Sequence, residues 1–233
     1  VIRGTAHTTH SGSRRGDAAP ETAGQAEAIR RALETAEVNP DTIGYIEANG
    51  MGTDMWDQAE IEAMATAFKT EKKQYCAVGS LKSNMGHLDC AAGIASFIKA
   101  ILAIKHRRIP PTLNCEQVNP HLKLDGTPFY INTELTEWIR RRHPLRAGVS
   151  GFDTGGTNVH IILEEAPRPR GPVPRSVTTA GQHIILLSAR TDTAIKTYAR
   201  DLVAFFMKNP FINMADAAYT LQVGRREFKH RLM

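Results

Sequence analysis

Three short segments combine glycines with side chains that could do chemistry. They read EANGMGT at 47–53, SLKSNMGHLD at 80–89 and SGFDTGGTN at 150–158. Each follows an apolar run with the composition of a buried strand. In an α/β sheet, the loops after several strands can meet at one edge and build a site. We therefore expect the three segments to converge.

In the second segment, His87 lies just before a predicted helix over 90–105, for which Asp89 is the expected N-cap. The positive end of a helix disfavours imidazolium, so a neutral imidazole that hydrogen-bonds a carbonyl or enolate oxygen is expected there. A histidine that only caps the helix is the alternative. Lys82 could pair with Glu47 or Glu60, orient His87, or be a plain surface or structural lysine.

In the first segment, the residue at the turn is Asn49. Its amide can donate a hydrogen bond but cannot take up a proton near neutral pH. This loop therefore has the form of a catalytic loop without a titratable catalyst. In the third segment, the turn at 155–158 leads into a strand rather than a helix. It suits main-chain amides that face an oxyanion better than it suits a phosphate.

Cys90 is the cysteine that most deserves consideration as a nucleophile, because a thiol in the first turn of a helix can have a lowered pKa. The run of small residues at 91–93 favours instead a small side chain packed in the core. Cys76, in a predicted strand, and Cys115, in a loop, have no activating base nearby in sequence. Three cysteines without paired or metal-binding spacing are typical of a reduced, cytoplasmic protein.

The elements that must position these residues alternate in type. Predicted strands cover 1–6, 43–47, 75–79, 128–133, 146–152 and 159–165, and predicted helices cover 24–38, 57–68 and 90–105. This alternation indicates an α/β layered sheet. The first strand starts abruptly, so we expect the chain to begin inside a larger fold.

Residues 166–182 contain four prolines without periodicity and are expected to form a linker. Beyond it we expect a strand at 183–189 and helices at 191–207 and 213–223, with no closing element. The predicted organisation is therefore a domain at 1–165, a linker at 166–182 and a second subdomain at 183–233.

The bulk composition excludes several classes. The chain has 233 residues, of which 42% are hydrophobic. It contains no apolar run of membrane-spanning length and no leader sequence, so neither a membrane span nor a signal peptide is predicted. A net charge of +5 is mild and could favour an acidic partner. The arginines at 140–142 have no interleaved aromatic residues, which favours a solvated loop over a nucleic-acid patch.

The three segments together resemble a known family. The C-terminal half of polyketide-synthase ketosynthases, which are thiolase-fold condensing enzymes, carries EAHGTGT, KSNxGH and SSFGFGGTNAH. Residues 1–167 are similar to this half, and residues 181–233 resemble the region that flanks such domains in modular synthases. The resemblance implies half of a thiolase-like layered α/β fold, followed by the start of an α/β flanking linker subdomain.

The resemblance also implies a set of roles. The family uses a Cys–His–His mechanism, in which the cysteine takes an acyl chain from the phosphopantetheine arm of an acyl carrier protein. His87 matches the second histidine, Lys82 matches the motif lysine, and Asn49 stands at the first histidine. The nucleophilic cysteine belongs to an N-terminal half, and the complete domain is expected to be a homodimer. The remaining implied residues are Thr154, Gly155 and Gly156 in the oxyanion and gating loop, and Met51, Thr53, Phe152 and Asn158 around the substrate.

The departures from the family pattern gather at the site. Thr154 stands where the family has Phe, Met51 where it has Thr, and Asn49 where it has His. The chain thus most resembles non-elongating ketosynthases, especially those of trans-acyltransferase synthases. The leading hypothesis is acyl transfer without Claisen condensation. The alternatives are an elongating ketosynthase that uses Asn49 and His87, and a non-catalytic scaffold for dimerisation and carrier-protein docking.

Overall fold

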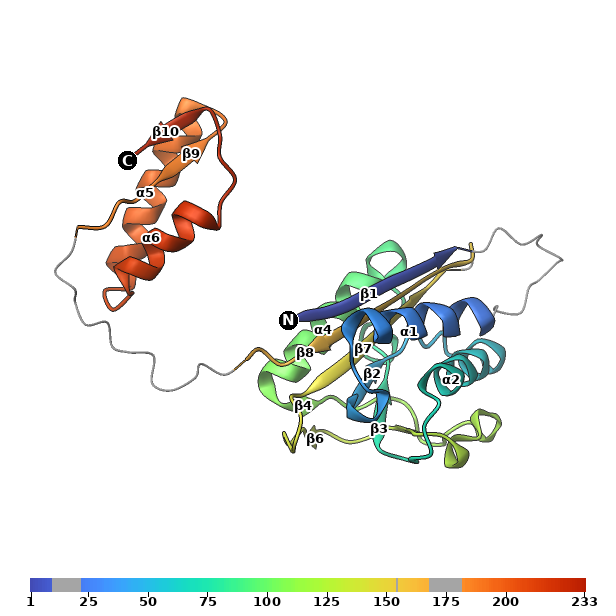
Figure 1. Cartoon of the computed structure of the whole chain (residues 1–233). Coiled ribbons are helices and arrows are strands. Elements are labelled where there is room, and N and C mark those ends of the chain that lie inside the picture. Colours follow the sequence, from blue (N-terminus) through green and yellow to red (C-terminus); the bar gives the residue numbers. More distant parts are fainter. Residues whose placement is uncertain (10–21, 154, 168–181) are drawn as a thin grey trace. The chain divides into compact units, whose positions relative to one another are not determined.

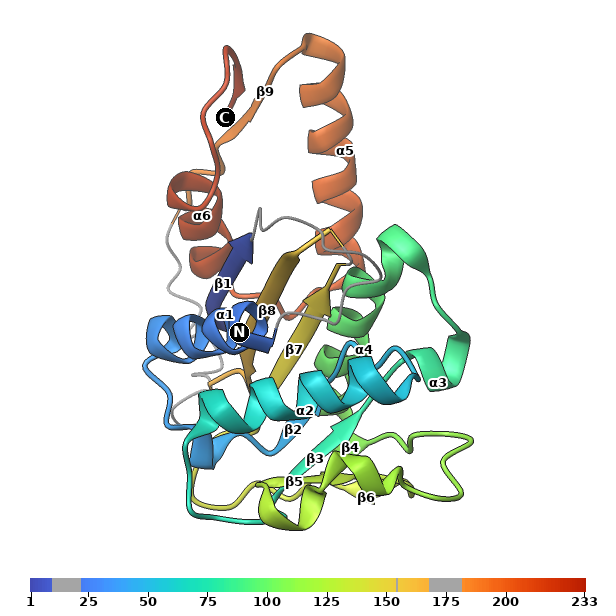
Figure 2. The same cartoon turned by 90° about the vertical axis from the view of Figure 1, so that its right-hand side faces the viewer.

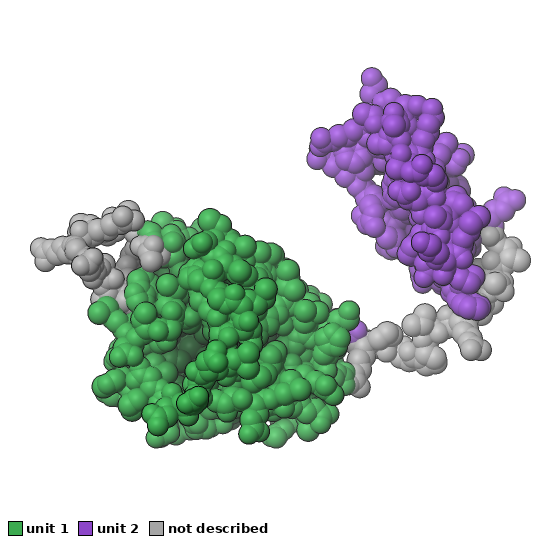
Figure 3. Space-filling model, turned by 180° about the vertical axis from the view of Figure 1, so that it is seen from behind, with its two compact units in different colours: residues 1–166 green, residues 167–233 purple. Residues whose placement is uncertain are grey.

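The computed structural model describes residues 1–9, 22–153, 155–167 and 182–233. The chain divides into two compact units, Val1–Ala166 and Pro167–Met233, coloured separately in Figure 3. The expected linker at 166–182 lies mostly outside the described residues, as does Thr154. In the ranges that are described, no helix is both long and apolar enough to cross a membrane.

A six-stranded sheet forms the centre of the first unit, with the strand order β1-β8-β7-β2-β3-β5. The strands are β1 (Ile2–Thr9), β8 (Thr157–Glu164), β7 (Arg146–Phe152), β2 (Tyr45–Glu47), β3 (Cys76–Gly79) and β5 (Phe129–Ile131). Strands β7, β2, β3 and β5 run parallel to one another, and β8 is antiparallel to both β7 and β1. The predicted strands are therefore confirmed, with shifted ends.

Helices cover both faces of this sheet (Figures 1 and 2). On one face, α1 (Thr22–Ala36) and α2 (Asp54–Phe68) pack with residues such as Ile29 and Met64 against Ile46. On the other face, α4 (Ala92–His106) packs with Ala100 and Ala103 against a second buried cluster. The predicted α/β layered architecture is confirmed.

Helix α4 is apolar on two sides. Its buried side consists of the small residues Ser96, Ala100 and Ala103, together with Ile104 near the C-terminal end. Four large apolar side chains on the helix are 40–58% exposed, namely Ile94, Ile98, Ile101 and Leu102. A helix that is apolar all round is normally buried. This second stripe has no cover within the described residues.

The segment between β3 and α4 differs from the expected loop. Residues Lys82–Met85 form the short helix α3, and Asp89–Ala91 form a 3-10 turn before α4. Asp89 adopts a positive φ of 46°, and Ala91 directly precedes α4. The prediction that Asp89 caps α4 is therefore wrong. Helix α2 also begins earlier than predicted, with Thr53 as its N-cap residue.

Short strands and 3-10 turns complete the first unit. Strand β4 (Arg108–Ile109) pairs with β6 (Thr136–Glu137), and the pairing brings residues far apart in the sequence together. Further 3-10 turns are formed by Pro40–Thr42, Pro120–Leu122 and Leu124–Gly126. Neither small strand was expected, because each has only two residues.

The second unit contains β9 (Leu187–Ala189), α5 (Asp192–Lys208), α6 (Met214–Val223) and β10 (His230–Leu232). Thr191 caps α5 by accepting a hydrogen bond from Ala194 N. Strand β10 pairs antiparallel with β9, so the expectation of no closing element is wrong. A small core of Leu187, Ala189, Ile195 and Leu221 holds the unit together.

Candidate functional site

The three predicted segments leave the sheet at one edge. Glu47 at the end of β2 is in register with Gly79 of β3 and with Val149 of β7, and the three strands are parallel. The segments that follow therefore start at the carboxyl edge, as expected for a site in an α/β sheet. The first two segments touch directly, since Ser80 Oγ donates to the Asn49 carbonyl at 3.4 Å.

Two carboxylates of α2 hold the first segment by its main-chain amides. Glu60 accepts hydrogen bonds from Asn49 N and from Gly50 N, both at 2.8 Å. Asp57 accepts from Gly52 N at 3.1 Å. Gly50 has a positive φ of 48°, and a Cβ atom there would lie 2.8 Å from Ser80. The loop path therefore requires glycine as well as the two acids.

Glu60 has an unusual ionisation in this role. Burial raises its pKa from 4.5 to about 7, although the amides of Gly50 and Asn49 and the charge of Lys82 lower it. Burial also raises the pKa of Asp57. A carboxylate that titrates near neutral pH thus supports the turn at Asn49.

Lys82 reaches the same turn from α3. Its Nζ donates to the Asn49 carbonyl oxygen and, at 3.1 Å, to Asn49 Oδ1. Burial lowers the pKa of Lys82. Within the described residues Lys82 forms no ion pair, so the suggested pairings with Glu47 or Glu60 are not formed. The observed partner of Lys82 is therefore Asn49.

Glu47 is satisfied on the α4 side of the sheet. Its carboxylate lies 3.0 Å from Lys99 Nζ and accepts hydrogen bonds from Leu81 N, at 2.6 Å, and from the Tyr45 hydroxyl. Burial raises the pKa of Glu47, and the charge of Lys99 opposes the shift. Glu47 therefore ties β2 to the start of the second segment and to α4.

His87 follows α3 and is partly exposed, at 43% of its side chain. Its Nδ1 accepts a hydrogen bond from Asp89 N at 2.9 Å, which leaves the ring proton on Nε2. In the part of the chain that the structure describes, no hydrogen bond joins His87 to Asn49 or Lys82. His87 thus supports the turn before α4 and keeps Nε2–H as a donor.

The described residues of the third segment make their hydrogen bonds within the turn and to β1. Gly155 N and Gly156 N donate to the side chain and the carbonyl of Asp153, so both amides are used within the turn. Phe152 packs against the core on the α1 and α2 side. Asn158 is buried in β8, and its Nδ2 donates a hydrogen bond to Thr8 Oγ1 of β1 at 3.3 Å. The role of Thr154 stays a prediction, because that residue lies outside the described ranges.

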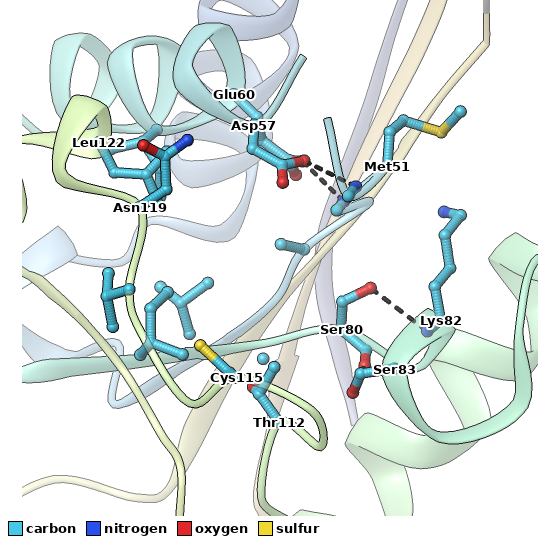
Figure 4. Close-up of a pocket in the computed structure, with 18 of the residues that line it drawn as sticks. Met51, Asp57, Glu60, Ser80, Lys82, Ser83, Thr112, Cys115, Asn119 and Leu122 are labelled. Atoms are coloured by element: carbon cyan, nitrogen blue, oxygen red, sulfur yellow. Dashed lines mark hydrogen bonds between the residues drawn. The ribbon is translucent and has the colours of Figure 1, made fainter. Parts of the chain in front are cut away.

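A cavity of about 470 Å³ opens beside the first two segments (Figure 4). Met51 and Thr53 line it from the first segment, and Lys82 and Ser83 line it from α3. The opposite wall comes from residues 112–119, a segment that includes Cys115 and that lies outside the three predicted segments. Asn49, His87 and the turn at 155–157 do not line this cavity. The expectation that Asn49, His87 and this turn line one cavity edge therefore stays a prediction. It concerns the complete ketosynthase-like domain, which includes an N-terminal half.

The three cysteines are free and lie in different environments. Cys76 is fully buried, and burial raises the pKa of its thiol. Cys90 is exposed, so its predicted packing in the core is wrong. No group of three metal-binding side chains capable of holding a metal ion occurs among the described residues.

The comparisons with known proteins identify the family. Residues 1–116 match the family described as beta-ketoacyl synthase, C-terminal domain, and residues 183–233 match CurL-like, PKS C-terminal. Polyketide synthase PksM of Bacillus subtilis (strain 168) is 38% identical over 99% of this chain and 6% of its own length. Polyketide synthase PksL of the same strain is 40% identical over 95% of this chain and 5% of its own length. The chain therefore spans only a small part of these curated relatives.

Solved structures give the same result. The ketosynthase from module 6 of the bacillaene synthase of Bacillus subtilis 168 is 38% identical, with a TM-score of 0.68, and the match covers 99% of this chain and 39% of that one. An oxazolomycin ketosynthase domain from Streptomyces albus JA3453 is 33% identical, with a TM-score of 0.67, over 100% and 41%. The expected thiolase-like fold is therefore confirmed, and the chain belongs to the ketosynthase family as the C-terminal half of a ketosynthase domain of a modular polyketide synthase.

Proposed function

We propose that this half domain takes part in acyl transfer between carrier proteins without Claisen condensation. It does so together with an N-terminal half that carries the nucleophilic cysteine. The observation that carries the proposal is Asn49 at the position of the family's first histidine, where Lys82 donates to its side-chain Oδ1 and Glu60 accepts from its main-chain N–H. An amide can donate a hydrogen bond to a carbonyl oxygen but cannot accept a proton.

Acyl transfer makes modest demands on such a site. The thiolate of the N-terminal half attacks the thioester carbonyl of the carrier-bound chain, the bond from the acyl carbon to the phosphopantetheine sulfur breaks, and the arm leaves as a thiolate. The thiolate of the next carrier's arm then attacks the acyl-enzyme, the bond from the acyl carbon to the enzyme sulfur breaks, and the enzyme thiolate leaves. Both directions need a thiolate and donors for the oxyanion. Condensation also needs acid–base support, and losing such a group typically costs about 10²–10⁴-fold in rate.

The exposed face of α4 supports the role of a second half domain. The exposed apolar stripe of α4 suits a second protein layer, and burying apolar area is the main driving force of association. The match covers 39% of a solved ketosynthase. We assign the cavity beside Met51 and Thr53, whose wall includes Ala48 and Gly50 on either side of Asn49, to the phosphopantetheine arm. Similarity to bacillaene and oxazolomycin ketosynthases supports the trans-acyltransferase class.

The test uses the ketosynthase domain completed by its N-terminal half. Acyl loading from a carrier-bound thioester and extension with malonyl carrier protein are followed side by side by mass spectrometry. We expect an acyl adduct and no extended product. A domain in which the nucleophilic cysteine is replaced by alanine is the control and should not load. Extension at a rate typical of the family would show an elongating ketosynthase, and absence of loading would leave the scaffold for dimerisation and carrier docking.

A further inference from the structure

Two basic segments that are distant in the sequence meet at the C-terminal end of α4. The first is 105–108, where the helix ends and β4 begins, and the second is 140–142, which follows β6. Strand β4 pairs with β6, with Arg108 opposite Glu137, and the two strands lie side by side (Figures 1 and 2). This pairing brings together six cationic side chains, namely Lys105, Arg107, Arg108, Arg140, Arg141 and Arg142.

One buried carboxylate joins the two segments. Glu165 lies 2.6 Å from the guanidinium group of Arg107 and 3.3 Å from that of Arg140, and its side chain is only 10% exposed. The remaining four cations are exposed and form no ion pair within the described residues, namely Lys105, Arg108, Arg141 and Arg142. Glu165 thus holds the two segments together while most of their positive charge faces solvent.

Two large apolar side chains lie beside these cations. Along residues 135–139 the exposure alternates, as it does in a strand with one face on the core. Trp138 faces inward, is 8% exposed and packs against Tyr45. Leu135 and Ile139 face outward and are 61% and 66% exposed. The outward face therefore combines aliphatic side chains with the arginines that directly follow Ile139.

This combination is typical of a protein interface rather than of a nucleic-acid site. Interfaces have an apolar centre and a polar rim, and arginine is enriched in them. Sites for single-stranded nucleic acid instead expose aromatic rings on which the bases stack. Here Trp138 is buried, and the exposed apolar side chains are aliphatic. The sign of the charge requires an acidic partner.

The second unit does not have the charge that such a partner requires. Residues 183–233 contain eight Lys and Arg residues and only four Asp and Glu residues. The whole chain has a formal charge of +5, so a second copy of it is also a poor electrostatic match. The complementary surface must therefore come from an acidic protein segment other than these.

We propose that Leu135, Ile139 and the arginines at 108 and 140–142 form a docking patch for an acidic protein segment with an apolar centre. Helix α4 has 15 residues and is therefore about 22 Å long. The patch lies at its C-terminal end, whereas His87 precedes its N-terminal end. Docking at the patch leaves the candidate site free, so the patch holds a partner and does not bind the acyl substrate.

Peptide binding to the completed ketosynthase domain tests the charge of the patch. The probe is a helical peptide in which a stripe of leucines runs between two rows of glutamates, and its binding is followed by titration calorimetry. We expect the probe to bind the parent. Arg141→Glu combined with Arg142→Glu should weaken binding at least about tenfold, because glutamates would then face glutamates.

Lys69→Glu combined with Lys73→Glu is the matched control for this experiment. Both lysines are exposed and lie outside the patch, and the two double variants have the same net charge. The control should bind like the parent. Equal weakening by the two double variants would show an effect of overall charge and would overturn the proposal, as would a parent that does not bind the probe.

Ile139→Ser tests the apolar part of the patch. We expect it to weaken binding of the probe at least about tenfold, because an apolar side chain is no longer buried in the complex. Ile184→Ser is the matched control, since Ile184 is 55% exposed and lies in the second unit. Because Ile139 makes no part of the core, the variant should melt like the parent. Unchanged binding by Ile139→Ser would overturn the proposal even if the charge variants failed to fold.

A DNA duplex separates a protein partner from a nucleic acid. At physiological salt we expect the duplex to bind more weakly than the acidic peptide. Tighter binding of the duplex would assign the patch to nucleic acid and overturn the proposal. None of these measurements involves acyl chemistry, so their outcome is independent of whether the domain loads or extends an acyl chain.

Discussion

At the scale of single residues, the site is organised around an amide rather than an imidazole. Lys82 engages Asn49 through its carbonyl oxygen and Oδ1, and Glu60 engages its N–H. A histidine at this place would keep the two main-chain contacts and lose the one to Oδ1. The contacts around Asn49 are therefore compatible with either side chain, and the proposed loss of acid–base function rests on the identity of the side chain alone.

Asn49→His is expected to restore part of the condensation chemistry. The imidazole is a group that can exchange a proton. It would act in addition to His87, which keeps Nε2–H as a donor. Acyl loading should change little, because it depends chiefly on the thiolate and the oxyanion donors. Loading and malonyl extension of the completed domain, parent and variant side by side, measure this. A parent that already extends chains as fast as the variant would contradict the non-elongating hypothesis.

Glu60 should make the stability of the domain depend on pH. Burial raises its pKa from 4.5 to about 7, so the folded state binds this proton more tightly than the unfolded state. The resulting stabilisation is full below about pH 4.5 and is lost as the pH rises through about 7. One pKa unit corresponds to about 1.4 kcal/mol, so the loss is a few kcal/mol.

Glu60→Gln is expected to remove this dependence between pH 4.5 and 7. The measurement is the melting temperature of the completed domain across that window, with Glu62→Gln, an exposed residue of the same helix, as the control. The control should follow the parent. An unchanged slope in Glu60→Gln would show that another group is responsible.

At the scale of secondary-structure elements, α4 is the helix that most needs a partner. Its sheet side buries Ser96, Ala100, Ala103 and Ile104, and its opposite side exposes four large apolar side chains. Contiguous exposed apolar surface of this kind typically marks an interaction site. We infer that the N-terminal half packs on this stripe, which also places a second layer next to His87 at the start of the helix.

Ile98→Asp should weaken association with the N-terminal half at least about tenfold, because it places an unpaired carboxylate in an apolar contact. Co-purification of the two halves, followed by titration, measures the effect. Val203→Asp in α5 is the matched control, since Val203 is 52% exposed and Ile98 is 50% exposed. Equal binding of Ile98→Asp and the parent would show that the stripe faces something else.

At the scale of the whole molecule, the chain carries the support of a site without its expected nucleophile. Cys76 is buried and its thiol pKa is raised, and no base activates Cys90 or Cys115 among the described hydrogen bonds. Exposure alone does not make a cysteine nucleophilic, because the thiolate is the reactive form. The second compact unit is a flanking subdomain that follows the half domain.

The chain alone is therefore expected to form no stable acyl-enzyme. Intact mass spectrometry after incubation with an acyl-thioester measures this, with the completed domain as the positive control. Because Cys90 is exposed and Cys115 lines the cavity, Cys90→Ala and Cys115→Ala variants would locate any adduct. A stable adduct that one of them abolishes would show that this half carries a nucleophile of its own.

The sequence by itself determined the alternation of strands and helices, the three segments at the sheet edge and the family, because local periodicity and motif spacing carry that information. The tertiary structure decided which partners meet. Lys82 binds Asn49 rather than Glu47 or Glu60, since Lys99 and two main-chain amides already occupy those carboxylates. It likewise decided that Cys90 is exposed and that β10 closes the second unit. Each outcome depends on contacts between residues distant in the chain, which local pattern does not encode.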